Sequence, residues 1–374
     1  MKAMSRIARN MPADATVTWN ADHTKVTVQG HTVIISEYVA RVQESLRSLS
    51  TRLDEEILFG IKFPSEAFSL PTTSQETYDV DTPGFGLFTF PAESDSDDHP
   101  AAFFLRKLCE AKQLCSNEQD TIVWDIQQVH KWLLDISDIW AEAQTLMHLL
   151  AIPGRGSEIA NWQYANSPTS SRHLFFSSTL QTLVTQSNYN KTTAITGRYK
   201  YILRIIPFKL SVIIIKLLRI VRPIEFLAFK SINPASISES SDTQAIYATY
   251  MFLSHGKIWN SNTLSACLRR WFQRELKVPW GLHLHRHFAQ ALQRMFLAYE
   301  GDNELANIAN EVMGHGLEVA DRNYAREGQD LSMDSTTRRK MEKVGYDWVW
   351  EVHKIPVSQS HLESDRKGKR KAQA

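Results

Sequence analysis

Short apolar runs near the N-terminus predict a small β-hairpin followed by a helix. The stretch VTVQGHTVII (26–35) places apolar residues on both sides of Gly30, which suits a tight turn between two strands. The next residues, EYVARVQESLRSLSTRLDEEILFG (37–60), have helical spacing with one apolar face. We expect Ser36 to cap this helix and Gly60 to end it.

Helical spacing returns twice before the middle of the chain. It covers AAFFLRKLCEAKQL (101–114) and DIQQVHKWLLDISDIWAEAQTLMHLLAI (125–152), and the second run stops at Pro153. The pattern then changes to shorter apolar runs, which predict a three-stranded antiparallel meander: HLFFSS (173–178), LQTLVTQS (180–187) and KYILRIIPF (200–208).

The pattern is again helical from Asn260 onward. Trp259, Trp271 and Trp280 lie in this part of the chain, and we expect them to be core residues. The fold class predicted from all these patterns is mainly α with a small three-stranded antiparallel sheet (α+β). The helical runs of this part are LSACLRRWFQREL (264–276), HLHRHFAQALQRMFLAY (283–299), NELANIANEVM (303–313) and LEVADRNYARE (317–327).

Length and composition describe a globular chain. With 374 residues and 43% hydrophobic content, typical domain sizes suggest two domains. Three scattered cysteines without CxxC spacing favour neither a disulfide framework nor a zinc site, and they indicate a reducing compartment. The start has no apolar core of signal-peptide length. The most apolar stretch, 201–229, is interrupted by charges too often for a membrane span, and we expect a strand and then a basic amphipathic helix.

Charge is unevenly distributed although the net charge is only +1. Residues 191–230 hold nine Lys and Arg against one acid, whereas residues 63–105 hold eight acids and no Lys or Arg. We expect 64–100 to be a long solvated loop, with an acidic partner segment or nucleic-acid mimic as the alternative. The end, ESDRKGKRKAQA, is expected to be a disordered basic tail, which is either a solubilising end or a nuclear-import patch.

Two basic residues stand where they could serve chemistry on phosphate. Arg155 in GRGSE follows a predicted helix end, with Glu158 three residues later, and a guanidinium can grip two phosphate oxygens. The alternative is a surface salt bridge. Lys191 in YNKT sits at a turn after the second predicted strand and could give a proton to a leaving oxygen in a cleft. The alternative is an ordinary solvated lysine.

Histidine, arginine and tyrosine complete the candidate set. In HLHRH, His283 and Arg286 are three residues apart and would share one helix face. In MGHGLEVADRNY, His315 precedes Tyr324 by nine positions. A buried tyrosine with one hydrogen bond explains Tyr324 equally simply. Zinc is not favoured, because no carboxylate or cysteine stands at ligand spacing in HLHRH.

The ordered set GRGSE, YNKT, HLHRH and MGHGLEVADRNY resembles the catalytic domain of the tyrosine recombinase (phage integrase) family over about residues 120–330. That family runs from a helix through RxxE, a three-stranded meander with a hairpin lysine and an HxxRH helix to GH and the tyrosine. IPGRGSEI and the start of the chain also look like the recombinase-like regions of fungal mobile-element proteins, which can adjoin a RecQ-type helicase. The sequence contains no GxxxxGK[ST] phosphate-binding loop.

The resemblance implies DNA strand cleavage and rejoining through a 3′-phosphotyrosyl intermediate, without metal or cofactor. Tyr324 would be the nucleophile, and Lys191 would protonate the departing 5′-hydroxyl, although Lys200 could reach the same cleft. The implied organisation is a DNA-clamp-like region (1–118), a catalytic domain (119–335) and a C-terminal segment (336–374). The implied catalytic residues are Arg155, Lys191, His283, Arg286, His315 and Tyr324.

The implied partners are double-stranded DNA, further copies of the chain on DNA and a helicase, with no membrane, and the implied location is the nucleus. The basic segment 191–230 is expected to lie against the DNA backbone. Two other functions stay open at this point. One is a non-catalytic DNA-binding protein derived from a recombinase. It is favoured because residues 1–118 hold only two or three helix-like segments and a long acidic loop, whereas the partner domain in the family is a compact helical bundle. The other is a topoisomerase IB-like relaxing enzyme, which uses a similar residue set as a monomer.

Overall fold

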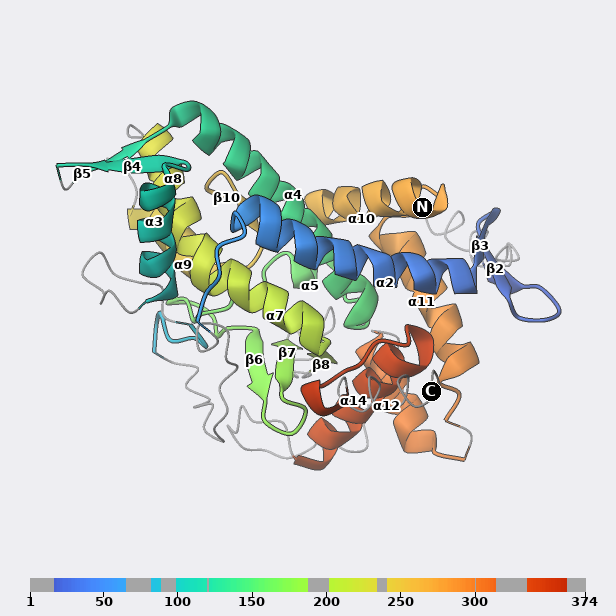
Figure 1. Cartoon of the computed structure of the whole chain (residues 1–374). Helices are drawn as coiled ribbons and strands as arrows, with labels where there is room; N and C mark the ends of the chain where they lie inside the picture. The colour runs from blue at the N-terminus through green and yellow to red at the C-terminus, as the bar shows by residue number, and fades with distance from the viewer. Residues whose placement is uncertain are drawn as a thin grey trace, which may run out of the picture.

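The computed structural model describes residues 17–64, 82–88, 99–119, 121–187, 202–233, 241–299, 301–313 and 335–361. This part of the chain is mostly helical, with four small antiparallel sheets (Figure 1), and so confirms the α+β class. The α-helices are α2 (Ile35–Arg52), α3 (Pro100–Ala111), α4 (Ile126–Leu150), α5 (Gly156–Ile159), α7 (Phe208–Lys216), α8 (Arg222–Ile232), α9 (Ser241–Thr249), α10 (Ser261–Leu276), α11 (Leu282–Phe296), α12 (Asn303–Val312) and α14 (Ser335–Asp347), with π-helical segments η1 (Leu53–Ile57), η3 (Leu217–Val221) and η5 (Trp348–Val352).

The predicted N-terminal hairpin is present and carries one more strand. Strands β2 (Lys25–Val28) and β3 (His31–Ile34) pair around Gly30, and β1 (Val17–Trp19) pairs with β2. The expectation that Ser36 caps the following helix is wrong. The helix starts at Ile35, whose amide still donates to a carbonyl of the hairpin, so strand β3 runs directly into α2. Gly60 does end this helical region, with a left-handed φ of +67° that suits glycine.

Helices α3 and α4 confirm the next two predictions. The carboxylate of Asp125 accepts from the amides of Gln127 and Gln128, which fixes the start of α4. Between the two helices lies a hairpin that the sequence pattern did not predict, β4 (Cys115–Glu118) paired with β5 (Thr121–Trp124). Its strands are short and mostly exposed, so they lack the apolar alternation that marks a half-buried strand.

The three-stranded meander predicted in the middle of the chain is confirmed. The order is β6-β7-β8, and both neighbouring pairs are antiparallel. A further two-stranded ribbon, β9 (Leu253–Ser254) with β10 (Lys257–Ile258), precedes α10. The meander strands are β6 (Leu174–Ser177), β7 (Thr182–Ser187) and β8 (Ile202–Ile205).

The part of 191–230 that the structure describes is more buried than a basic amphipathic surface helix would be, and its expected contact with DNA stays a prediction. Helices α7 and α8 and the π-helical segment between them are largely buried, and α8 packs on α4. Arg222 is 0% exposed, forms an ion pair with Glu225 at 3.0 Å, and lies over the ring of Trp140. The segment is buried because most of its other residues are apolar, and the carboxylate of Glu225 balances the charge of Arg222.

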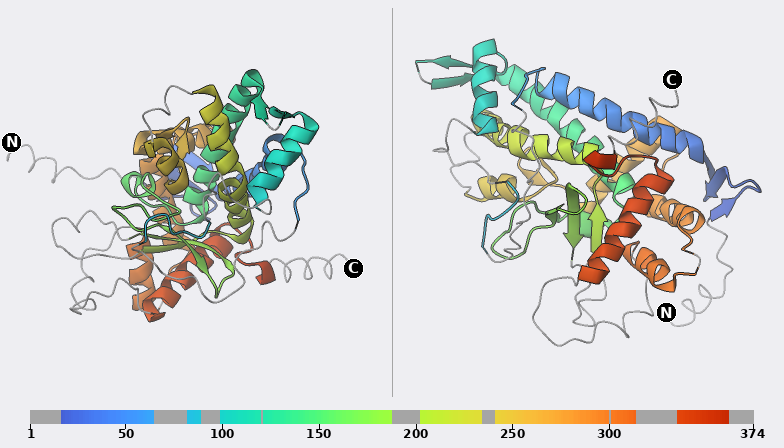
Figure 2. Two further views of the ribbon diagram at one scale, coloured as in Figure 1. Left: turned by 90° about the vertical axis from the view of Figure 1, so that its left-hand side faces the viewer. Right: turned by 60° about the horizontal axis from the view of Figure 1, so that its bottom comes forward.

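Residues from both ends of the chain share one hydrophobic core. Helix α2 lies along α4 (Figures 1 and 2), and Tyr38 on α2 stacks on Phe272 and donates to or accepts from His353 near the C-terminus. The C-terminal segment contributes Trp348, which is fully buried and donates to the carbonyl of Leu149 at 3.1 Å. The three tryptophans expected in the core are buried there: Trp259, Trp271 and Trp280.

Part of the expected acidic loop pairs with the segment that follows α5. The peptide at Gly86 pairs with Ala165, and the amide of Gly84 donates to the carbonyl of Asn166 at 2.8 Å. The described residues do not include the rest of 65–98, the expected helix 317–327 or the expected tail 363–374. No helix in the described ranges is long and apolar enough to cross a membrane.

Candidate functional site

Arg155 lies where three helices begin close together. It directly precedes the short helix α5, and a Cβ atom at Gly156 would come within 2.8 Å of Leu282 at the start of α11 and 2.9 Å of Ser261 at the start of α10. Glycine therefore permits this close approach of α5 to the two longer helices. The packing brings Arg155 of GRGSE beside the helix that carries HLHRH.

Glu158, the acid of the same motif, is buried and accepts hydrogen bonds from three segments of the chain. It is 5% exposed, and its two carboxylate oxygens accept from Arg204 Nη1 at 2.5 Å, Ser187 Oγ at 2.6 Å and the Arg155 amide at 3.3 Å. Burial by itself would raise the pKa of Glu158, but the Arg204 charge and these hydrogen bonds outweigh burial and hold that pKa below its usual value. The carboxylate is thus ionised and links α5 to strands β7 and β8.

Arg286 on α11 completes a cluster of guanidinium groups. Burial lowers its pKa, and the positive charges of Arg155 and Arg204 lower it further, so the three groups lie within electrostatic reach of one another. The negative charge of Glu158 opposes these effects and raises the pKa of Arg286. Three arginines around one glutamate leave a net positive charge, which favours binding of an anion such as a phosphodiester. We call Arg155, Glu158, Arg204 and Arg286 the arginine cluster.

The end of α12 rests on the arginine cluster. Arg286 Nη2 donates to the carbonyl of Met313 at 2.9 Å, and Arg204 Nη2 donates to the carbonyl of Val312 at 3.4 Å. Cations at the C-terminal end of a helix satisfy its last carbonyl groups and match the negative end of the helix dipole. The cluster therefore fixes the point from which the chain continues toward His315.

Two histidines of HLHRH have different surroundings. His283 is exposed on α11, and its ring lies 4.7 Å from the ring of His287, centroid to centroid. Burial lowers the pKa of His287, and the nearby His283 and Arg286 lower it further. His283 and Arg286 thus lie on neighbouring turns of one side of α11, as their spacing predicted.

Behind the arginine cluster lies a buried histidine pair. The rings of His148 on α4 and His285 on α11 are 5.0 Å apart, and both residues are nearly inaccessible to solvent. Burial lowers the pKa of His148 to about 3, with further repulsion from Arg204 and Arg286. Both imidazoles are therefore neutral at physiological pH, and they add no charge to the site.

Lys191, His315 and Tyr324, together with the alternative Lys200, lie outside the described residues. The described residues that precede each of the two gaps contact the cluster. Ser187, four positions before Lys191, donates to Glu158, and Met313, two positions before His315, accepts from Arg286.

Arg204 is the site residue that the sequence analysis missed. It was counted among the basic residues expected on a DNA-facing surface, whereas it is 1% exposed. The available signal was its place in the strand ILRI, where apolar neighbours on both sides indicate burial. A fully buried arginine needs an acidic partner. The partner, Glu158, is 46 positions away in the sequence.

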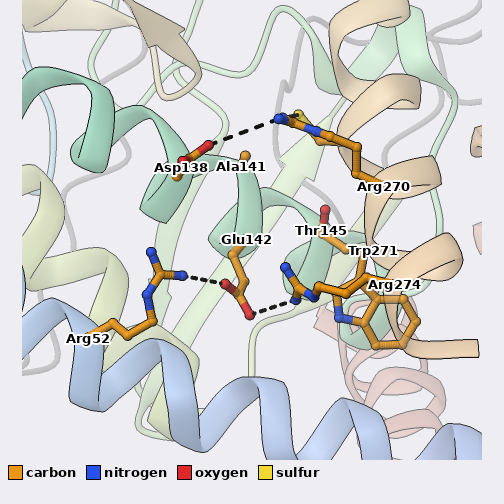
Figure 3. Close-up of a pocket in the computed structure, with 9 residues that line it drawn as sticks. Arg52, Asp138, Ala141, Glu142, Thr145, Arg270, Trp271 and Arg274 are labelled. Atoms are coloured by element: carbon orange, nitrogen blue, oxygen red, sulfur yellow. Dashed lines mark hydrogen bonds and ion pairs between the residues drawn. The ribbon is translucent and has the colours of Figure 1, made fainter. Parts of the chain in front are cut away.

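A separate cavity of about 330 Å³ lies between α2, α4 and α10 and contains no residue of the arginine cluster. Figure 3 shows Arg52 and Arg274 pointing from two helices toward Glu142 on the third. The ion pairs measure 2.9 Å from Arg52 and 3.4 Å from Arg274, and Glu142 is 8% exposed. This arrangement joins the three helices, with each arginine already paired to a carboxylate.

Comparison of the chain with protein-family models, curated proteins and solved structures finds no match. Within the residues that the structure describes, no three or more His, Cys, Asp or Glu side chains are grouped so that they could hold a metal ion. The chemistry of the site must therefore be inferred from the arginine cluster and the segments that adjoin it.

Proposed function

We propose that the protein breaks and rejoins DNA strands in the manner of a tyrosine recombinase, in the integration or excision of a mobile element. The observation that carries this proposal is the arginine cluster at the meeting point of α5, the meander and α11. Arg155 and Arg286 come from motifs 131 positions apart, and their proximity is what phosphodiester chemistry requires. A single salt-bridged arginine on the surface would not explain it.

The proposed reaction needs positive charge at the scissile phosphate. As the nucleophile attacks, negative charge gathers on the non-bridging phosphate oxygens, and preorganised donors stabilise that charge. Arg155 and Arg286 would bind these oxygens, while Glu158 accepts from the Arg155 amide and attracts Arg286 by its charge. His283 would hydrogen-bond the phosphate or help deprotonate the nucleophile.

The remaining roles fall to residues outside the described ranges. The Tyr324 oxygen would attack phosphorus, forming a phosphotyrosyl bond while the bond to the 5′-oxygen breaks. Lys191 would give its proton to that departing oxygen, and His315 would bind a further phosphate oxygen. A second 5′-hydroxyl then reverses the step, because the phosphotyrosyl bond conserves the energy of the original phosphodiester. The connection of Ser187 and Met313 to the cluster supports these assignments for Lys191 and His315.

The first prediction concerns the nucleophile. Purified protein is incubated with nicked suicide DNA from its own genomic flanks, and products are separated on a denaturing gel. We expect a protease-sensitive covalent band that disappears in Tyr324→Phe, because phenylalanine lacks the attacking oxygen, while DNA binding stays within a few-fold. Tyr250→Phe, at a partly buried tyrosine on the described surface, is the matched control and should retain the band.

The same experiment separates the competing functions. Salt-dependent DNA binding without any covalent band would contradict the enzyme and favour a non-catalytic DNA-binding protein. A band formed by a monomer that relaxes supercoiled DNA without exchanging strands would favour a topoisomerase IB-like activity. Covalent attachment together with strand exchange between two DNA duplexes supports recombination.

A further inference from the structure

Two cysteine thiols meet at the corner between α3 and β4. Cys109 lies on the last turn of α3, and Cys115 is the first residue of β4. Their Sγ atoms are 3.3 Å apart, and both thiols are free. The six-residue spacing gave no sign of this contact, since it matches no disulfide or metal motif.

The backbone between the cysteines holds the two thiols together. Lys112 ends α3 with a left-handed φ of 51°, and Leu114 has a φ of 63°, so the chain turns back sharply within three residues. The amide of Gln113 donates to the carbonyl of Leu108 at 2.9 Å, and the carbonyl of Leu114 accepts from Asp125 at 2.8 Å. The turn therefore holds the backbone of the two cysteines close together, within reach of a side-chain contact.

The two thiols differ in their access to solvent. Cys115 is 4% exposed, and burial, followed by the hydrogen bond and repulsion from Cys109, raises the pKa of its thiol to about 12. Cys109 is partly exposed. A small oxidant from solvent therefore reaches Cys109 first, while Cys115 remains protonated beside it.

We propose that Cys109 and Cys115 form an oxidisable dithiol site that reacts with a peroxide and closes to an intrachain disulfide. In the first step the Cys109 sulfur attacks the peroxide, the O–O bond breaks, and a sulfenic acid forms as water or an alcohol leaves. In the second step the Cys115 sulfur attacks the Cys109 sulfur, the S–O bond breaks, and water leaves with the Cys115 proton. Two thiols are oxidised by two electrons, and the peroxide is reduced.

The disulfide would connect α3 to the hairpin β4–β5, which projects from the molecule in Figure 1. Closing the bond requires the sulfurs to approach from 3.3 Å to ~2.05 Å, which is a small side-chain movement. Reversible disulfides of this kind are the ones found in reducing compartments, where they act as redox sensors. Cys267, which is buried on α10, supplies an internal comparison.

The test uses the full chain and does not depend on DNA cleavage, so its failure is distinct from failure of the proposed function. The protein is treated with hydrogen peroxide, quenched, denatured and alkylated, and its thiols are counted by mass spectrometry. We expect the count to fall from three to one, with a mass loss of two hydrogens, and dithiothreitol should restore it. Trypsin cuts after Lys112, so peptides 108–112 and 113–131 should appear joined without reductant.

Two variants separate the steps of this reaction. Cys115→Ser should stop the link and leave a Cys109 sulfenic acid that dimedone traps, because the second sulfur is gone. Cys267→Ser should still lose two thiols and form the same joined peptides. Three thiols remaining after peroxide, or a link that includes Cys267, would overturn the proposal, as would oxidation of Cys109 beyond sulfenic acid in the wild type.

Discussion

Arg204 and Glu158 form a buried ion pair at the centre of the site, with the two side chains 2% and 4% exposed. Removing one partner of such a pair leaves a charge in a medium that cannot solvate it, which is costly. The same pair joins α5, β8 and the end of α12. At the residue scale, the geometry of the site therefore depends on the charge balance of these two groups.

The second prediction follows from this balance. Arg204→Met should lower the free energy of unfolding by ~3–5 kcal/mol, because Glu158 is left buried and uncompensated. Adding Glu158→Gln should recover part of the loss, since the amide keeps a hydrogen-bonding group without the charge. Urea denaturation of the three proteins measures both effects. A double variant less stable than Arg204→Met alone would contradict the ion-pair explanation.

The third prediction concerns acid stability. The pKa of His148 is about 3 in the folded chain and ~6.5 when unfolded, so the unfolded chain binds a proton that the folded chain does not. The contribution of His148 to the free energy of unfolding is fully present above pH ~6.5. It falls as the pH drops below that value, by up to ~1.4 kcal/mol per pH unit. His148→Gln should reduce that slope between pH 6.5 and 5, measured by urea denaturation. His31→Asn, on exposed β3, is the control, and an equal change in both variants would contradict the account.

At the scale of elements, three helices are joined through one carboxylate. Glu142 on α4 accepts from Arg52 on α2 and from Arg274 on α10 (Figure 3). Burial raises the pKa of Glu142, and the two arginines oppose that rise. Helix α2 is therefore attached to α4 and α10 by charge as well as by apolar packing.

The fourth prediction compares two arginines of α2. Arg52→Ala should lower the free energy of unfolding by ~1–3 kcal/mol, because buried Glu142 loses a charged hydrogen-bond donor. Arg47→Ala, which removes an ion pair whose side chains are 59% and 61% exposed, should change it by no more than ~0.5 kcal/mol. Chemical denaturation of both variants is the measurement. Equal losses would mean that the ion pair with Glu142 does not hold α2.

Several elements were predictable because their signal is local. The helices α3, α4, α10, α11 and α12 each contain an apolar repeat of helical period, and the meander strands contain short apolar runs. The hairpin β4–β5 has no such repeat, because CSNE is polar and most of TIVW is exposed. The burial of Arg204 and Arg222 was not predictable from charge counts, since a count does not show which distant carboxylate or backbone group each arginine meets.

The candidate site was predictable only in part for the same reason. The spacing within HLHRH places His283 and Arg286 on one side of a helix, and the structure agrees. The meeting of Arg155 with Arg286 depends on how α5 packs against α11 and followed from the family resemblance alone. Neither the motif spacing nor the family resemblance pointed to Arg204, because its role is set by contacts with Glu158 and Val312 from distant segments.

At the scale of the whole molecule, the C-terminal segment belongs to the core. Helix α14 packs on β8 and α12, and η5 places Trp348 against α4. Tyr38 near the other end of the chain contacts His353 at 3.0 Å. The described parts of regions 1–118 and 336–374 thus support the region that holds the arginine cluster.

The fifth prediction tests this support. Trp348→Ala should lower the free energy of unfolding by ~3–5 kcal/mol, because it leaves a large cavity in the core and an unpaired carbonyl at Leu149. Trp350→Ala, at a partly exposed tryptophan two positions along, should cost clearly less. Thermal and urea unfolding of the two variants measure the difference. Similar losses would show that this segment packs differently from the structure described.

The central claim is that Tyr324 forms a covalent bond to DNA beside the arginine cluster. The most direct measurement is mass spectrometry of the protein after reaction with suicide DNA, digestion by nuclease and cleavage by trypsin. The account predicts a nucleotide 3′-phosphate on peptide 323–326, Asn-Tyr-Ala-Arg, which contains Tyr324. A nucleotide attached to any other peptide, or a covalent complex that survives in Tyr324→Phe, would contradict it.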